Sequence, residues 1–89
     1  MSGLSWFWEA RKEEAWSRML ANLNIEKKRK FSCDDLTRII GKEEIPKYFR
    51  NPQHDIGALF HEKLVVGEIE EAGEMMGRYN RRIRLYQQT

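Results

Sequence analysis

Residues 51–70 read NPQHDIGALFHEKLVVGEIE and contain a change from helical to strand periodicity. Asn51 followed by Pro52 predicts a helix start, because asparagine caps free backbone N–H groups and proline fits the first helical position. Apolar residues then recur at helical spacing and predict the buried face of a helix over 52–64: Ile56, Leu59, Phe60 and Leu64. Over 65–71 the apolar period shortens toward two, which predicts a strand.

The residues that follow this strand predict a β-hairpin. Gly73, Gly77 and Asn80 are residues that favour turns. Residues 82–86 then alternate charged and apolar side chains, as a half-buried strand does. We therefore expect an antiparallel hairpin whose loop spans residues 73–80.

The sequence before residue 51 predicts two further helices. Residues 5–23 contain no Gly or Pro, and their apolar residues fall on one side at 100° per residue: Trp8, Ala15, Trp16, Met19, Leu20 and Leu23. A helix of two turns is expected after Ser32, which can form a capping box with Asp35, and Gly41 suits its C-terminal end. We expect residues 42–50 to be a connection, since an Ile-Pro pair within them disfavours helix.

Length and composition indicate one small folded domain, which we place at residues 1–89. The chain has 89 residues, of which 40% are hydrophobic, and both values suit a single core rather than a disordered segment. The lone Cys33 cannot form an internal disulfide, so we expect an intracellular, cytoplasmic protein. The longest apolar runs have three residues, far fewer than the roughly 20 that a membrane span needs.

Positive charge is concentrated in two short segments. The formal net charge of +2 is too small for a protein that binds nucleic acid through its overall charge. Residues 27–30 carry +4 and residues 77–89 also carry +4, whereas residues 65–76 carry −4. Any contact with a polyanion must therefore be local.

The order of these elements resembles a winged helix-turn-helix domain over roughly residues 15–88. A helix is followed by a short apolar segment at Phe31, two helices and a hairpin, and residues 59–70, which enter a segment rich in Gly and Arg, are the most characteristic part. The resemblance implies an α+β fold of three helices and a C-terminal β-hairpin wing. It also implies that helix 52–64 is the recognition helix, which commonly enters the major groove, and that residues 73–80 are the wing.

Polar side chains in four places are candidates for contact with double-stranded DNA. Guanidinium groups present forked donors to phosphate oxygens, and basic residues near a helix N-terminus add to its positive potential. Asp55 and Glu62 share the surface of helix 52–64, which favours non-specific or structure-dependent contact. The candidates are Arg78, Arg81, Arg82 and Arg84 in the wing, Lys28, Arg29 and Lys30 in the first basic segment, Lys47 and Arg50 before the recognition helix, and Gln53, His54, His61 and Lys63 on it.

Each basic group also has a purely structural interpretation. The wing arginines could form a solvated strand face that pairs with Glu68 and Glu70 across the hairpin, which would leave none free for DNA. Residues 27–30 could be an ordinary solvated loop. Met75 and Met76 are expected to fold back over the core, or else to serve as adaptable contacts.

Residues 1–8 contain candidates for partner binding. Trp8 suits the buried stripe of the first helix, but Trp6 and Phe7 either fold over a small core, bind a partner or mediate a homodimer. Leu4, Phe7 and Trp8 also resemble the hydrophobic-x-x-aromatic-aromatic core of the box by which replication and repair proteins bind the sliding clamp, although the usual leading Gln is absent. This second resemblance implies an accessory subunit of a replication or repair complex.

No set of residues indicates catalysis. His54 and His61 are seven residues apart, about 10 Å along a helix, and do not form the i, i+4 pair that binds zinc. Cys33 is expected to be a small packed residue. We therefore predict a protein that is not an enzyme and has no metal or cofactor. It is either a small DNA-binding protein, acting as a transcriptional regulator or architectural factor, or a protein-interaction module.

Overall fold

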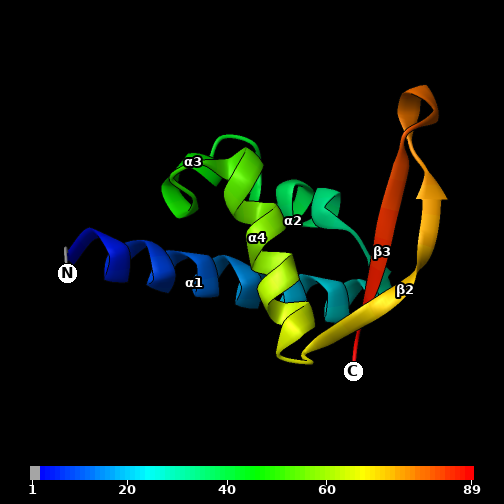
Figure 1. Cartoon of the computed structure of the whole chain (residues 1–89), viewed down its shortest axis with the longest axis horizontal. Coiled ribbons are helices and arrows are strands. Elements are labelled where there is room, and N and C mark those ends of the chain that lie inside the picture. The colour runs from blue at the N-terminus through cyan, green and yellow to red at the C-terminus, as the bar shows by residue number, and fades with distance from the viewer. Residues whose placement is uncertain (1–2) are drawn as a thin grey trace.

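A computed structural model describes residues 3–89, with side chains from Trp6 onward. Within residues 3–89 the chain forms four α-helices and one antiparallel sheet of three strands (Figure 1). The predicted α+β class is confirmed, whereas the predicted number of three helices is wrong. None of the described helices is long and apolar enough to span a bilayer. In chain order the elements are α1 (Gly3–Glu26), β1 (Lys30–Phe31), α2 (Cys33–Ile40), α3 (Ile45–Tyr48), α4 (Pro52–Val65), β2 (Ile69–Met76), a 3-10 turn η1 (Arg78–Asn80) and β3 (Arg82–Gln88).

The start of α2 follows the predicted capping box. Ser32 Oγ accepts a hydrogen bond from the Asp34 N–H at 3.2 Å, and Asp35 Oδ2 accepts one from the Ser32 N–H at 2.9 Å. These two bonds satisfy backbone donors that have no partner within the helix. At the other end Gly41 has a φ of +93°, a conformation that disfavours residues with a Cβ.

An aromatic cluster joins four elements into one core. The Trp16 ring of α1 lies 5.0 Å from the Phe60 ring of α4, and Phe60 lies 5.3 Å from Tyr86 of β3. Phe31 of β1 packs against both Trp16 and Phe60, at 6.3 and 6.1 Å between centroids. Ala15, Met19 and Leu23 of α1 are also buried, which confirms the predicted apolar stripe of that helix. The cluster therefore places α1, α4 and the sheet around a common centre.

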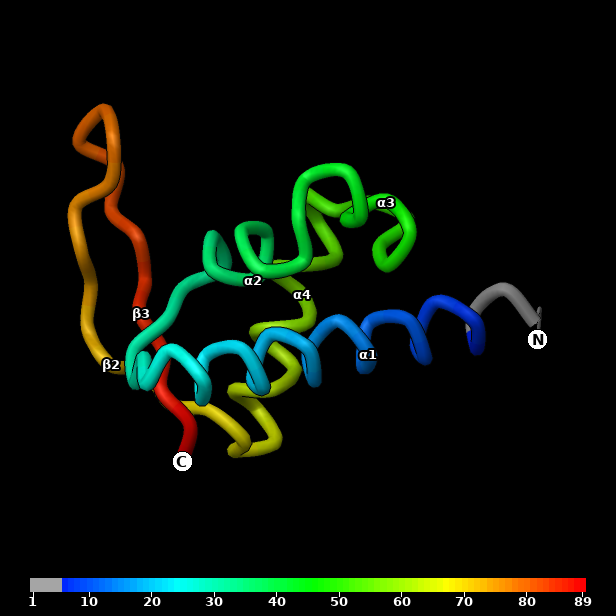
Figure 2. Tube along the Cα trace, turned by 180° about the vertical axis from the view of Figure 1, so that it is seen from behind, coloured from blue at the N-terminus to red at the C-terminus, as the bar shows by residue number. Residues whose placement is uncertain are grey.

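The sheet has the strand order β1–β3–β2, with β3 in the middle. β1 is short and pairs only with the C-terminal end of β3, where Phe31 is opposite Tyr86. β2 pairs with β3 along its whole length, and a bulge between Glu71 and Gly73 increases the local twist. Beyond β1 the hairpin is a two-stranded ribbon that projects past the helices (Figures 1 and 2).

Two predicted boundaries between helix, strand and loop are wrong. Residues 65–68 do not form a strand, because the Val66 and Glu68 N–H groups donate to the carbonyls of Glu62 and Lys63 and close the end of α4. The predicted wing loop at 73–80 is also too long. β2 continues to Met76, so the turn comprises only residues 77–81.

The segment before α4 also differs from the prediction. Residues 42–50 contain the one-turn helix α3, because its proline lies in the first turn, where a missing N–H leaves no hydrogen bond unmade. α4 begins at Pro52 as predicted, but the Asn51 side chain makes no capping hydrogen bond. Instead, Asp55 Oδ2 accepts the N–H of Asn51 at 2.9 Å, so the cap comes from within the helix.

Candidate nucleic-acid interface

Three exposed arginines surround the tip of the hairpin. Arg78 lies in η1, Arg81 follows it and Arg82 begins β3. The turn is closed by the Gly77 N–H, which donates to the Arg81 carbonyl at 2.7 Å. Within the part of the chain that the structure describes, none of the three guanidinium groups forms an ion pair. The tip therefore presents three positive charges to solvent.

Among the described residues, Arg84 is the hairpin arginine that pairs with an acid. Its Nη1 lies 3.4 Å from Glu71 Oε1, and both side chains are more than half exposed, so the pair is weak and can exchange for another anion. The alternative pairing with Glu68 and Glu70 is wrong. Glu68 binds Lys63, and Glu70 accepts a hydrogen bond from Gln87 Nε2 at 2.6 Å.

A small groove separates the hairpin from the start of α2. It has a volume of about 180 Å³ and is lined by Cys33, Asp34, Tyr86 and the arginines of β3. Burial, followed by the nearby Asp34 carboxylate, raises the pKa of the Cys33 thiol to about 11. Cys33 is thus a packed, protonated thiol, and the positive potential of the groove comes from the strand side.

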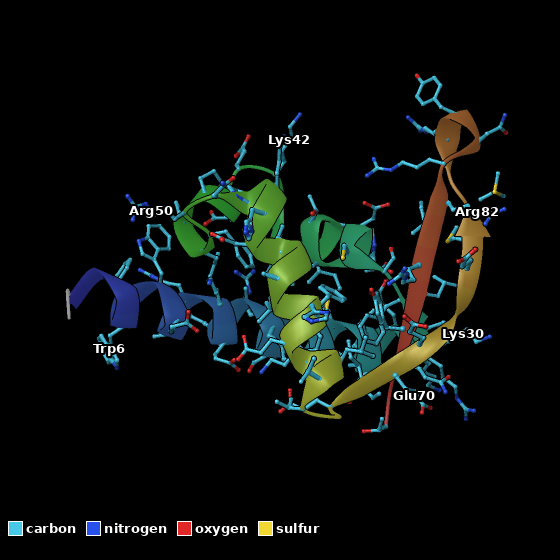
Figure 3. The ribbon with its side chains drawn as sticks, viewed as in Figure 1. Trp6, Lys30, Lys42, Arg50, Glu70 and Arg82 are labelled. Carbon is cyan, nitrogen blue, oxygen red and sulfur yellow. The ribbon has the colours of Figure 1, made fainter. Side chains whose placement is uncertain are left out.

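The N-terminal half of α4 lies at the same end of the molecule as the hairpin tip (Figure 1). Gln53 and His54 are exposed in its first turns, and His61 is exposed two turns further along. Lys42, after α2, is exposed and extends from this end, as Figure 3 shows. Sequence reasoning missed Lys42, because nothing in the local pattern indicates that the loop after α2 lies beside the start of α4.

The two basic residues before α4 differ in their surroundings. Lys47 Nζ lies 3.2 Å from Glu44 Oε2 in an exposed pair one turn apart. Arg50 is exposed and forms no ion pair with any acid that the structure describes. In Figure 3 it extends from the segment between α3 and α4, on the side of the molecule away from the hairpin. Arg50 and Lys42 can therefore add positive potential near the start of α4.

The prediction that Lys63 is exposed on α4 is wrong. Its side chain is only 8% exposed and its Nζ is 2.8 Å from Glu13 Oε1 and 3.2 Å from Glu68 Oε2. Burial disfavours the charged amine, but the hydrogen bonds to Glu13 and Glu68 outweigh it and raise the pKa of Lys63. Lys63 therefore neutralises acids of its own chain.

The first basic segment lies at the foot of the hairpin. Lys30 is opposite Gln87 in the sheet, five residues along β3 from Arg82, or about 17 Å at strand spacing. Figure 3 shows Lys30 and Arg82 toward opposite ends of the hairpin. Lys28 binds Asp35 Oδ1 at 2.7 Å, whereas Arg29 and Lys30 are exposed. The fold thus does not join this segment to the tip.

The N-terminal end of α1 extends beyond the other helices (Figure 2). Trp6 is 75% exposed, so of the three alternatives for this residue, the one in which its ring folds over the core is wrong. Phe7 is 41% exposed, packs edge-on against the half-buried Trp8 at 5.4 Å and lies under the Arg11 guanidinium at 5.2 Å. The side chain of Leu4, the first residue of the box-like motif, lies outside the described residues. Trp6 is the most exposed aromatic ring of this end.

The residues that could ligate a metal ion are dispersed over the described part of the chain. No three His, Cys, Asp or Glu side chains there are close enough to hold a metal ion. Met75 and Met76 are exposed on the hairpin, so the expectation that they cover the core is wrong.

Comparison with known proteins found no matching family model, no matching curated protein and no matching solved structure.

Proposed function

We propose that this protein is a winged-helix DNA-binding protein that holds duplex DNA between the hairpin tip and the start of α4. One observation carries the proposal: Arg78, Arg81 and Arg82 are exposed, have no acid partner among the described residues, and lie on a hairpin whose tip is at the same end of the molecule as the start of α4 (Figure 1). Arginine donors suit phosphate oxygens, and the wing would follow the DNA backbone while α4 faces the major groove.

The arrangement of elements supports the winged-helix interpretation. α1, β1, α2, α4, β2 and β3 follow in the expected order, and β1 pairs with β3 at the foot of the wing. α3 fills the long connection between the second helix and the recognition position. The main departure from a plain helix-turn-helix motif is therefore an inserted helical turn.

The distribution of charge predicts weak sequence discrimination. α4 offers Gln53, His54 and His61 to the bases, but Glu62 is also exposed on it. A carboxylate near phosphates opposes binding, so the phosphate contacts of the tip dominate the free energy. This balance favours an architectural factor over a regulator with one strict operator.

Binding to a labelled random duplex across a salt series tests the proposal. The variant R78Q/R81Q/R82Q removes three charges from the tip, and K27Q/R29Q/K30Q removes three from the foot of the hairpin as a matched control. We expect the tip variant to bind at least about tenfold more weakly and to lose about three units of salt slope. The foot variant should lose much less affinity and much less of the salt slope. Equal losses in both variants, or no binding by the unaltered protein at low salt, would overturn the proposal.

A second candidate function is protein interaction through the end of α1. The exposed Trp6, on a helix end that projects from the body, is the kind of anchor that dominates protein interfaces. If this end forms a homodimer, sedimentation velocity should show a dimer that becomes a monomer in Trp6→Ala. An unaltered protein that stays monomeric at high concentration would exclude the homodimer. Binding of the unaltered protein to purified sliding clamp would then test the accessory-subunit interpretation.

A further inference from the structure

Tyr79 occupies an unusual position at the tip of the hairpin. The residue is 98% exposed, and its backbone has a φ of +62° and a ψ of +35°. A bulky residue in this left-handed region is uncommon, and glycine or asparagine would adopt it with less strain. Asn80, next to it, has a φ of +56°. The turn therefore holds a large aromatic ring in solvent at a point where a smaller residue would suit the backbone better.

The surroundings of this ring indicate what it can bind. Arg78 and Arg81 flank the Tyr79–Asn80 pair in sequence, Arg82 follows, and none of the three arginines is paired with an acid in the described structure. A flat aromatic face among cations matches a nucleobase whose phosphates lie on either side. An apolar protein surface, in contrast, would leave three desolvated charges without partners. The chemistry of the tip therefore favours nucleic acid with an accessible base.

We propose that Tyr79 stacks on an unpaired base, so that the hairpin binds a junction between duplex and single strand more tightly than fully paired DNA. This inference rests on the proposed function of the hairpin and names its preferred substrate. In a fully paired duplex the base faces are covered by their neighbours, and the ring can reach only backbone. At a fork or a bulge one base face is free, and the arginines bind the phosphates beside it.

Two DNA probes and two variants test this inference. One probe is a paired duplex, and the other has the same sequence with a forked end and 2-aminopurine at the junction. We expect the unaltered protein to bind the fork about 5- to 150-fold more tightly, the range that one stacked base provides, and to change the 2-aminopurine fluorescence. Tyr79→Phe should keep the preference because it keeps the ring. Tyr79→Ala should lose it and yet bind paired duplex within about threefold of the original.

The outcomes separate this inference from the proposed function. If the unaltered protein binds both probes equally, or if Tyr79→Ala keeps the preference for the fork, the stacking role is overturned while duplex binding stands. If neither probe binds, both proposals fail. Tyr79→Gly relieves the backbone strain and serves as the folding control, because a loss of preference in both Gly and Ala variants cannot arise from misfolding of the turn.

Discussion

Lys63 donates to both carboxylate oxygens of Glu13 at 2.8 Å and thereby joins α4 to α1 across fifty residues of sequence. The same amine lies 3.2 Å from Glu68 Oε2, in the turn before β2, and 5.7 Å from the centroid of the Trp16 ring. One cation thus links α4, the first helix and the start of the hairpin. A lysine that the sequence makes a candidate for DNA contact instead pairs with two acids of its own chain.

Lys63→Met tests this assignment. Methionine preserves most of the apolar stem against Trp16, and Glu13 and Glu68 remain about half exposed, so neither acid is left buried. We expect the affinity for paired duplex to stay within about twofold and the free energy of unfolding to fall by no more than about 1 kcal/mol. Binding in the salt series and urea denaturation measure the two quantities. A severalfold loss of duplex affinity with normal stability would place Lys63 in the interface after all.

Asp35 is expected to make stability depend on pH in the acid range. Burial opposes its ionisation, but hydrogen bonds from Lys28, the Ser32 N–H and Arg38 outweigh that effect and hold the pKa of Asp35 below its usual value. Because the folded pKa is lowered, the stabilisation is present above about pH 4 and is lost as the pH falls through the folded pKa.

Asp35→Asn should therefore lose about 1–3 kcal/mol of unfolding free energy at pH 7, because a buried hydrogen-bonded acid is removed from the capping box and from its cations. The difference from the unaltered protein should shrink near pH 2. Urea denaturation at the two pH values measures it. If the variant and the unaltered protein differ by the same unfolding free energy at pH 7 and pH 2, the ionised carboxylate contributes nothing to stability.

Trp6 and Trp16, which both lie in α1, should differ sharply in their contribution to stability. Trp16 is 3% exposed in the aromatic core, and truncation to Ala should cost about 3–5 kcal/mol. Trp6→Ala should change the free energy of unfolding by no more than about 0.5 kcal/mol, because its ring stands in solvent. Thermal denaturation of both variants at low protein concentration checks this. A large loss in Trp6→Ala would mean that its ring is buried in solution, for example in a dimer.

Cys33 should be a slow nucleophile at neutral pH. With a pKa of about 11, only about one thiol in a thousand is ionised at pH 8. The rate of alkylation by iodoacetamide should keep rising through pH 9 and 10, whereas that of a free model thiol levels off earlier. The reaction is followed by the loss of free thiol with time, and glutathione serves as the model thiol for comparison. A plateau near pH 8 or 9 would show that the helix N-terminus, and not burial, controls the thiol.

Local signals predicted much of the fold. The capping box of Ser32 and Asp35, the turn at Gly41 and the buried stripe of α4 are each defined by residues three or four positions apart, so the chain carries them without reference to distant segments. The short helix α3 could not be predicted, because a proline in the first turn of a helix and a proline in a loop have the same local sequence. The placement of Lys63 could not be predicted, because its partners are an acid fifty residues earlier and one beyond the helix end.

The sequence by itself determined the three longer helices, the hairpin and where positive charge occurs, since periodicity, caps and composition act over a few residues. Only the tertiary structure decided which basic side chains form ion pairs within the chain and which remain unpaired among the described residues. Packing brought Glu13 and Glu68 to Lys63 and Asp35 to Lys28, while the hairpin left Arg78, Arg81 and Arg82 without an ion pair to any described acid. Ion pairing depends on distances of a few ångströms between segments far apart in the chain, and those distances exist only in the folded protein.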